Sequence, residues 1–175
     1  MLNILIGCNG QGKTIYLEKE LEDKGKEYTV VSNLTTDDFD TTNLGISMER
    51  MTLLDEDFRD MCLAGDDIVI LSSNNVGIKT EDDWVYSDAF LKIFNKIMLE
   101  SEVLILDEPE FMLKDNEETI LRELLVRLKD TYKEIYVATH NQDLMWEADN
   151  LYWIQDMDKK KLEHKEELYE YFGTV

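Results

Sequence analysis

Several residue types are scarce in this chain, and each scarcity excludes a class of protein. Cys8 and Cys62 are the only cysteines among 175 residues, which is too few for a disulfide framework and fits a reduced compartment. The two histidines, His140 and His164, complete no zinc-ligand spacing and no Ser-His-Asp or Cys-His arrangement. No apolar run approaches the length of a membrane span. The apolar run at residues 2–6 also lacks the basic lead-in of a signal peptide, so we expect a cytoplasmic protein without membrane insertion.

Positive charge is scarce as well. The chain has 18 basic and 39 acidic residues, for a net charge of -21. A surface this acidic repels phosphate backbones, so direct binding of nucleic acid is disfavoured. A basic protein partner would be favoured instead. The alternative is that the acidic residues only keep the domain in solution.

The apolar residues form short runs that alternate with helical patterns. Hydrophobic content is 43%, and the chain shows no repeat, low-complexity segment or linker, so we expect a single domain over residues 1–175. The predicted buried strands cover residues 2–6, 28–32, 68–71, 103–106, 135–138 and 151–154. Helices are predicted at 14–24, from Ser47 to Gly65, after caps at Ser87 and Asn116, at 142–148 and at 165–172, with a turn at 158–160. This alternation predicts an α/β fold of three layers, a mostly parallel sheet with helices on both faces.

The stretch GCNGQGKT, residues 7–14, follows the first predicted strand and opens the first predicted helix. It matches the full P-loop pattern, which a chance glycine-rich turn would produce in roughly one chain in a hundred or fewer at this length. Backbone N–H groups would surround the phosphates, Lys13 would reach the β- and γ-phosphates, and Thr14 would bind Mg²⁺. The predicted nucleotide-binding residues are Asn9, Gly10, Gln11, Gly12, Lys13 and Thr14.

A second motif, VLILDEPE at residues 103–110, joins a buried strand to two carboxylates and to the only proline, Pro109. Open α/β sheets place their ligands at the carboxyl ends of the strands, where Asp107 and Glu108 stand. Neighbouring residues on an extended backbone point to opposite sides, so one carboxylate would hold a metal while the other faces a water. Pro109 would end the strand at once.

The third motif is a histidine at the end of a strand. His140 follows the predicted strand at 135–138 and precedes a helix, as the P-loop and the acid pair do at their own strands. A lone histidine is more often structural, but here the other two motifs are expected at the same sheet edge. A neutral imidazole there would hydrogen-bond a γ-phosphate or a water.

Together, the three motifs resemble the nucleotide-binding domain of ABC-type ATPases, a family of P-loop NTPases. The resemblance rests on GCNGQGKT, on LILDEPE and on the histidine in YVATHNQDLM. The segment LDEPEFMLKDNEETILRELLVRL is similar in particular to the soluble branch that includes the SMC, RecF and OLD-type ATPases, in which a third acid and a helix follow the proline. The similarity covers the N-terminal strand, loop and helix and most of the chain after Ser87.

This resemblance implies a P-loop NTPase fold that binds ATP and Mg²⁺ and hydrolyses the ATP. Lys13 and Thr14 would bind phosphate and Mg²⁺, and Asp107 would hold Mg²⁺ through water. Glu108 would be the general base that polarises the attacking water, and His140 would sense the γ-phosphate. A nucleotide-dependent homodimer and a separate protein partner are also implied.

The chain departs from the family pattern at the signature motif, a serine followed by two glycines. That place reads Tyr86-Ser87-Asp88-Ala89-Phe90. Ser87 would supply the serine, but Asp88 puts negative charge where a γ-phosphate should dock.

Two further departures concern the nucleotide. No glutamine lies between Gln11 and Gln142 to serve as the Q-loop residue, which leaves Asn74 or Asn75 as a weak substitute. Too few residues precede the P-loop to supply an upstream aromatic side chain for adenine.

Three functions remain open on this basis. The first is a compact ABC-type ATPase whose hydrolysis is coupled to a partner protein. The second is an ATP-responsive interaction module with little hydrolysis, which Asp88 and the missing glutamine favour. The third is a small P-loop kinase, which the scarcity of arginine disfavours because such enzymes close a basic lid over the phosphates.

Overall fold

The computed structural model describes residues 1–24, 28–32, 47–53 and 87–172 of the chain. Four sequence predictions therefore lie outside the described residues. They are the strand at 68–71, the helix from Ser47 to Gly65 beyond residue 53, the Q-loop substitutes Asn74 and Asn75, and Tyr86 of the signature region.

The described strands form one sheet. They are β1 (Leu2–Ile6), β2 (Tyr28–Ser32), β3 (Val103–Asp107), β4 (Glu134–Ala138), β5 (Asn150–Gln155) and β6 (Asp158–Leu162), in the order β2-β3-β4-β1-β5-β6. Every neighbouring pair is parallel except β5 and β6, which are antiparallel. The carboxyl ends of β1, β3 and β4 therefore open on the same edge, with β4 between the other two.

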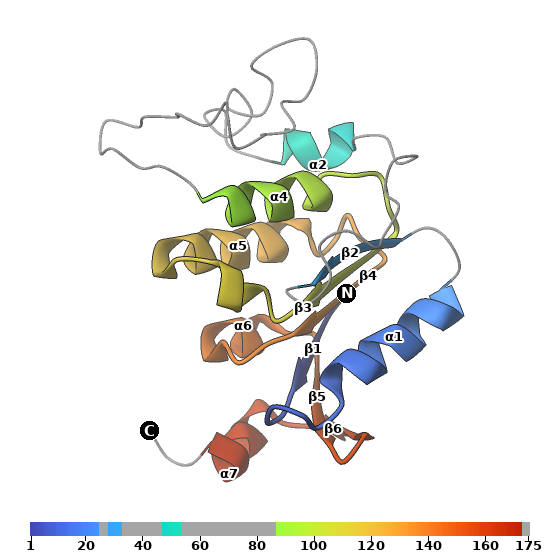
Figure 1. Ribbon diagram of the computed structural model, residues 1–175, viewed down its shortest axis with the longest axis vertical. Coiled ribbons are helices and arrows are strands. Elements are labelled where there is room, and N and C mark those ends of the chain that lie inside the picture. Colours follow the sequence, from blue (N-terminus) through green and yellow to red (C-terminus); the bar gives the residue numbers. More distant parts are fainter. Residues whose placement is uncertain (25–27, 33–46, 54–86, 173–175) are drawn as a thin grey trace.

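Helices cover both faces of this sheet (Figure 1). The helix α1 (Lys13–Lys24) lies on one face, whereas α4 (Asp88–Ile97), α5 (Asp115–Leu128) and α6 (Gln142–Glu147) lie on the other. The short α2 (Met48–Thr52) lies beyond α4, and a 3-10 turn (Lys165–Glu167) leads into α7 (Leu168–Phe172). This arrangement confirms the predicted three-layer α/β fold with a mostly parallel sheet. None of the helices in the described ranges is long and apolar enough to cross a membrane.

Two apolar clusters, one on each face, explain why the strand sequences do not alternate with polar residues. The larger lies under α4, α5 and α6 and includes Leu2, Ile4, Ile6, Phe90, Phe94, Leu104, Leu106, Leu125, Leu128, Ile135 and Val137. The smaller lies under α1 and consists of Leu5, Leu17, Val30, Val103, Ile105, Tyr136, Ala138 and Ile154. Alternate residues of β1 and β3 serve opposite faces, so both faces need apolar side chains.

The predicted turn at 158–160 is wrong, because these residues begin β6. The turn lies just before them, at Asp156 and Met157, which adopt positive φ angles of 50° and 64°. The lysines of β6 are exposed on an edge strand, where charge discourages further strand pairing, so the apolar pattern of a buried strand is missing.

Of the two predicted helix caps, the one at Ser87 is confirmed and the one at Asn116 is wrong. Ser87 caps α4 as expected, and its hydroxyl accepts a hydrogen bond from the Phe90 N–H. The cap at Asn116 is wrong, since α5 starts at Asp115 with Lys114 at the N-cap. The Glu117 carboxylate accepts from the Lys114 N–H at 3.0 Å and thereby sets the start of the helix.

Candidate functional site

Residues 7–12 form the loop between β1 and α1, and its glycines stand where other residues would be strained or would clash. Gly10 and Gly12 have φ angles of 77° and 100°. A Cβ on Gly7 would lie 2.3 Å from the Ile154 carbonyl oxygen, so only glycine lets the loop pass this close to β5. The glycine spacing of the sequence motif is therefore a requirement of the loop's backbone path.

Lys13 opens α1 and turns its side chain back into this loop. The ammonium is buried, at 5% exposure, and donates to the carbonyl oxygens of Gly7 at 2.8 Å and Cys8 at 3.2 Å. It also forms an ion pair with the Glu108 carboxylate, with Nζ and Oε1 3.0 Å apart. A buried positive charge thus lies at the centre of the loop, where an anion would be attracted.

Asp107, the last residue of β3, contacts Thr14, the second residue of α1. Its Oδ2 accepts a hydrogen bond from the Thr14 hydroxyl at 2.8 Å. Its Oδ1 is buried and has no hydrogen-bond partner among the residues that the structure describes. Burial raises the pKa of the Asp107 carboxyl above its usual range; the Thr14 hydrogen bond opposes this rise, and the Glu108 charge adds to it. A buried carboxylate with an unused oxygen fits a divalent cation, which would satisfy that oxygen and favour the ionised form.

The backbone at Glu108 differs from the extended geometry that the sequence suggested. Glu108 has φ 47° and ψ 54°, a left-handed conformation, and Pro109 follows as the first residue of a 3-10 turn (Pro109–Met112). The two carboxylates consequently do not separate to opposite sides of a strand. Asp107 contacts Thr14 while Glu108 contacts Lys13, so consecutive acids contact the first two residues of α1.

His140 follows β4 and completes the cluster. Its Nε2 lies 3.1 Å from Glu108 Oε1, 3.0 Å from Asn9 Oδ1 and 3.5 Å from Lys13 Nζ. Because the two nearest atoms are oxygen acceptors, this geometry suits an imidazole with its proton on Nε2. The structure therefore brings Lys13, Thr14, Asp107, Glu108 and His140 together at one edge of the sheet.

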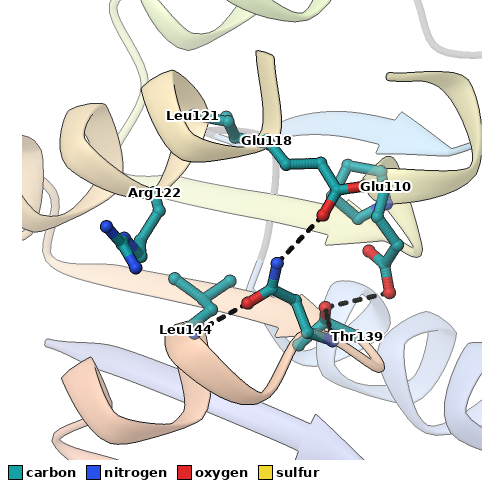
Figure 2. A pocket seen from close by; sticks show the side chains of 8 residues that line it. Glu110, Glu118, Leu121, Arg122, Thr139 and Leu144 are labelled. Carbon is teal, nitrogen blue, oxygen red and sulfur yellow. Dashed lines mark hydrogen bonds between the residues drawn. The ribbon is translucent and has the colours of Figure 1, made fainter. Parts of the chain in front are cut away.

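Glu110 is a site residue to which the sequence reasoning gave no role. One oxygen of its carboxylate accepts from the His140 backbone N–H at 2.6 Å and from the Thr139 hydroxyl at 2.9 Å. Figure 2 shows Glu110 turned toward Thr139 across a small hollow between α5 and the segment that leads into α6. The third acid of LDEPE was the available sequence signal. Its partners, Thr139 and His140, lie 29 and 30 residues later and could not be predicted from the sequence.

Gln11 also has contacts that the sequence did not indicate. Its backbone carbonyl accepts from the Met157 N–H at 3.0 Å, and its side-chain oxygen accepts from the Asp156 N–H at 2.8 Å. The turn between β5 and β6 is thereby attached to the phosphate loop. Gly12 lies against the same turn, since a Cβ there would be 3.1 Å from Met157 Cγ.

Solved structures resemble this chain in fold. No protein-family model matches the chain, and neither does any curated protein. A metal-chelate-type ABC transporter in an inward-facing conformation aligns with a TM-score of 0.60 and 18% identity, over 98% of this chain and 78% of that one. A dimeric ATP-binding cassette in a post-hydrolysis state, bound to ADP and phosphate, aligns with a TM-score of 0.53 and 13% identity, over 93% and 86%.

The chain has the fold of an ABC transporter ATPase domain. At these identities the likeness concerns the fold alone, and the more specific resemblance to the SMC, RecF and OLD-type branch stays a prediction.

Proposed function

We propose that this chain binds Mg-ATP and hydrolyses it, as a compact ABC-type ATPase coupled to a partner protein. The observation that carries the proposal is the convergence of Lys13, Asp107, Glu108 and His140 from three separate strand ends onto one loop. Each has the chemistry that phosphoryl transfer to water requires: a cation for phosphate, an oxygen ligand for Mg²⁺, a base and a hydrogen-bond donor.

The loop would hold the phosphates through Lys13 and its backbone N–H groups. The Thr14 hydroxyl and Asp107 would hold Mg²⁺, either directly or through water, because Mg²⁺ takes few protein ligands and completes its shell with phosphate oxygens and waters. The bound ion would supply charge neutralisation on the phosphates. Asp107 Oδ1, which has no hydrogen-bond partner in the described ranges, supports this assignment, since a ligand oxygen has to be available to the ion.

Glu108 is engaged by Lys13 and His140 in this structure, at 3.0 Å and 3.1 Å. A triphosphate in the loop competes with Glu108 for the Lys13 ammonium and frees the carboxylate from its strongest partner. Glu108 then accepts a proton from the attacking water, whose oxygen bonds to the γ-phosphorus as the bond to the ADP oxygen breaks and ADP leaves. His140 Nε2 donates a hydrogen bond to the γ-phosphate during this step. Under this proposal the base becomes available only when substrate is bound.

Two variants test the assignments. Lys13→Ala should weaken ATP binding by about tenfold to a hundredfold, measured by titration calorimetry with Mg²⁺ present.

Glu108→Gln should keep ATP binding and lower phosphate release by about a hundredfold or more, because the amide cannot accept the proton. Glu102→Gln is the matched control, since Glu102 is exposed and precedes β3 at the opposite edge of the sheet. Unchanged turnover in Glu108→Gln would remove the base assignment, and the absence of binding heat with the unmodified chain would remove the proposal.

Dimerisation on ATP is part of the proposal, and the dimeric neighbour bound to ADP and phosphate supports it.

The contacts of Ser87 favour a second function, an ATP-responsive interaction module with little hydrolysis. The Ser87 hydroxyl accepts from the Phe90 N–H and donates to the Glu117 carboxylate at 2.7 Å, so its single O–H donor is already used and is not available to the phosphate oxygens of a second subunit's nucleotide. Sizing Glu108→Gln with and without ATP separates the two. A nucleotide-dependent dimer supports the ATPase, and a persistent monomer supports the module.

A further inference from the structure

The turn between β5 and β6 holds a methionine in an unfavourable conformation. Gln155 pairs with Asp158, so Asp156 and Met157 alone make the two-residue connection. Both have positive φ angles, 50° and 64°, in a turn whose positions usually hold glycine, asparagine or aspartate. A methionine side chain there costs stability relative to glycine, which suggests that the side chain serves a purpose other than folding.

This turn is attached firmly to the phosphate loop. The Met157 N–H donates to the Gln11 carbonyl at 3.0 Å, and the Asp156 N–H donates to the Gln11 side chain at 2.8 Å. Met157 lies directly against Gly12, the residue before Lys13. Despite these contacts its side chain is 61% exposed. The backbone of Met157 is therefore held beside the loop, and its apolar side chain is left open to a ligand.

The direction of a nucleotide in the loop can be deduced from the strand order. Glu108 and His140 mark the γ-phosphate end, and they follow β3 and β4, on one side of β1. The other neighbour of β1 is β5. A triphosphate with its γ end at β3 and β4 leads its nucleoside away from them, toward β5 and the turn that follows it.

We propose that Met157 is the contact for the nucleotide base, with its thioether lying against the face of the purine ring. Sulfur is polarisable and makes favourable contacts with aromatic rings. The rings of Tyr16 and Tyr152 each have the Lys159 ammonium 4.5 Å from their centroids, so one face of each ring already has a partner. The site takes a nucleoside triphosphate, and a contact with the flat face of the base does not by itself separate adenine from guanine. This inference depends on the proposed function, because the direction of the nucleotide is taken from it.

The test compares two ligands on two variants. Met157→Gly should weaken binding of Mg-ATP by about three- to tenfold, the range of a sulfur–aromatic contact. Binding of Mg-tripolyphosphate, which has no base, should not change. Met157→Leu keeps an apolar side chain and should retain most of the ATP affinity. Met157→Gly should melt at the same or a higher temperature than the unmodified chain, because glycine suits the positive φ, so lost affinity cannot come from unfolding.

Three outcomes overturn this inference. Equal weakening of both ligands would mean that Met157 acts only by supporting the phosphate loop. Unchanged ATP affinity in Met157→Gly would mean that the base lies elsewhere, while the proposed ATP binding would stand. Failure of the unmodified chain to bind either ligand would reject the proposed function as well. Met48→Ala is the matched control, because Met48 is equally exposed, at 61%, but lies on α2.

Discussion

Two buried carboxylates in this protein, Glu117 and Asp107, differ in how many hydrogen bonds they accept. Glu117, in the first turn of α5, has no exposed surface, and its oxygens accept from the Ser87 N–H at 2.5 Å, the Ser87 hydroxyl at 2.7 Å and the Lys114 N–H at 3.0 Å. Asp107, at the end of β3, is 4% exposed and accepts one hydrogen bond, from Thr14. Its second oxygen has no partner within the described part of the chain.

The difference separates a carboxylate that holds the fold together from one that is ready to bind a ligand. Glu117 joins the start of α4 to the start of α5, two helices that lie side by side on one face of the sheet (Figure 1). Its bonds offset the cost of burying a charge. Asp107 has fewer hydrogen bonds to offset the cost of burying its charge, in agreement with the raised pKa of its carboxyl. A bound cation would remove this cost. The predictions that follow test this distinction, beginning with the largest effect.

Replacing Glu117 should cause the largest loss of stability. Glu117→Ala removes a buried side chain and leaves the partly buried N–H groups of Ser87 and Lys114 without their acceptor, and we expect a loss of about 3 kcal/mol in the free energy of unfolding. Urea denaturation measures it. Glu123→Ala, at an exposed position of the same helix, is the control and should change little. A loss for Glu117→Ala no larger than that control would end the structural assignment.

Replacing Glu110 should affect catalysis and leave binding intact. Glu110→Ala removes the acceptor that holds the His140 backbone, so we expect ATP turnover to fall by about tenfold with an unchanged Kd. Glu110→Gln keeps an oxygen acceptor and should restore most of the rate, which marks Glu110 as a positioning residue. A parallel change in Kd and turnover, or no rescue by glutamine, would contradict this role.

Replacing Asp107 should make the ligand-free protein more stable. The gain should be smaller than the loss expected for Glu117→Ala. Because burial raises the pKa of this carboxyl, its charged form costs stability in full at every pH above the raised pKa. The cost begins to fall as pH drops through the raised pKa, and it is gone below the usual pKa of aspartate. Asp107→Asn removes the charge and should raise the melting temperature at neutral pH. The extra stabilisation that Mg²⁺ gives beyond ATP alone should vanish in the same variant. A lower melting temperature without ligand would show that Asp107 is structural, as Glu117 is.

A third carboxylate, Asp149, extends the comparison to the surface and should give the smallest effect. The Leu2 backbone N–H, donating at 2.8 Å, holds the pKa of Asp149 below its usual range, with a smaller contribution from Lys129. A lowered pKa stabilises the fold above the usual pKa of aspartate, and this contribution is lost as pH falls through the lowered value. Asp149→Ala should cost less than about 1 kcal/mol at neutral pH, since water screens a partly exposed group. Acid titration of unfolding in the two proteins should converge at low pH.

Much of the fold was predictable from local pattern. The sequence predicts β1 and β2 to the residue, and β3, β4 and β5 within one residue at each end, because a largely buried strand appears as a short, mostly apolar run. β6 could not be predicted this way, because its lysines face water and only its pairing with β5 makes it a strand. The start of α5 was missed because a side chain three residues into the helix sets it.

The candidate site follows the same division. The amino-acid sequence alone determined that a glycine-rich loop, an acid pair and a histidine each follow a parallel strand, which places them at one edge of the sheet. Tertiary structure decided how they meet: the left-handed turn at Glu108, its ion pair with Lys13, the contact of Glu110 with His140 and the attachment of Met157 to Gln11. The physical reason is that backbone propensity and burial act over a few neighbouring residues and can be read along the chain. Contacts between residues far apart in sequence depend on how strands and helices pack in space.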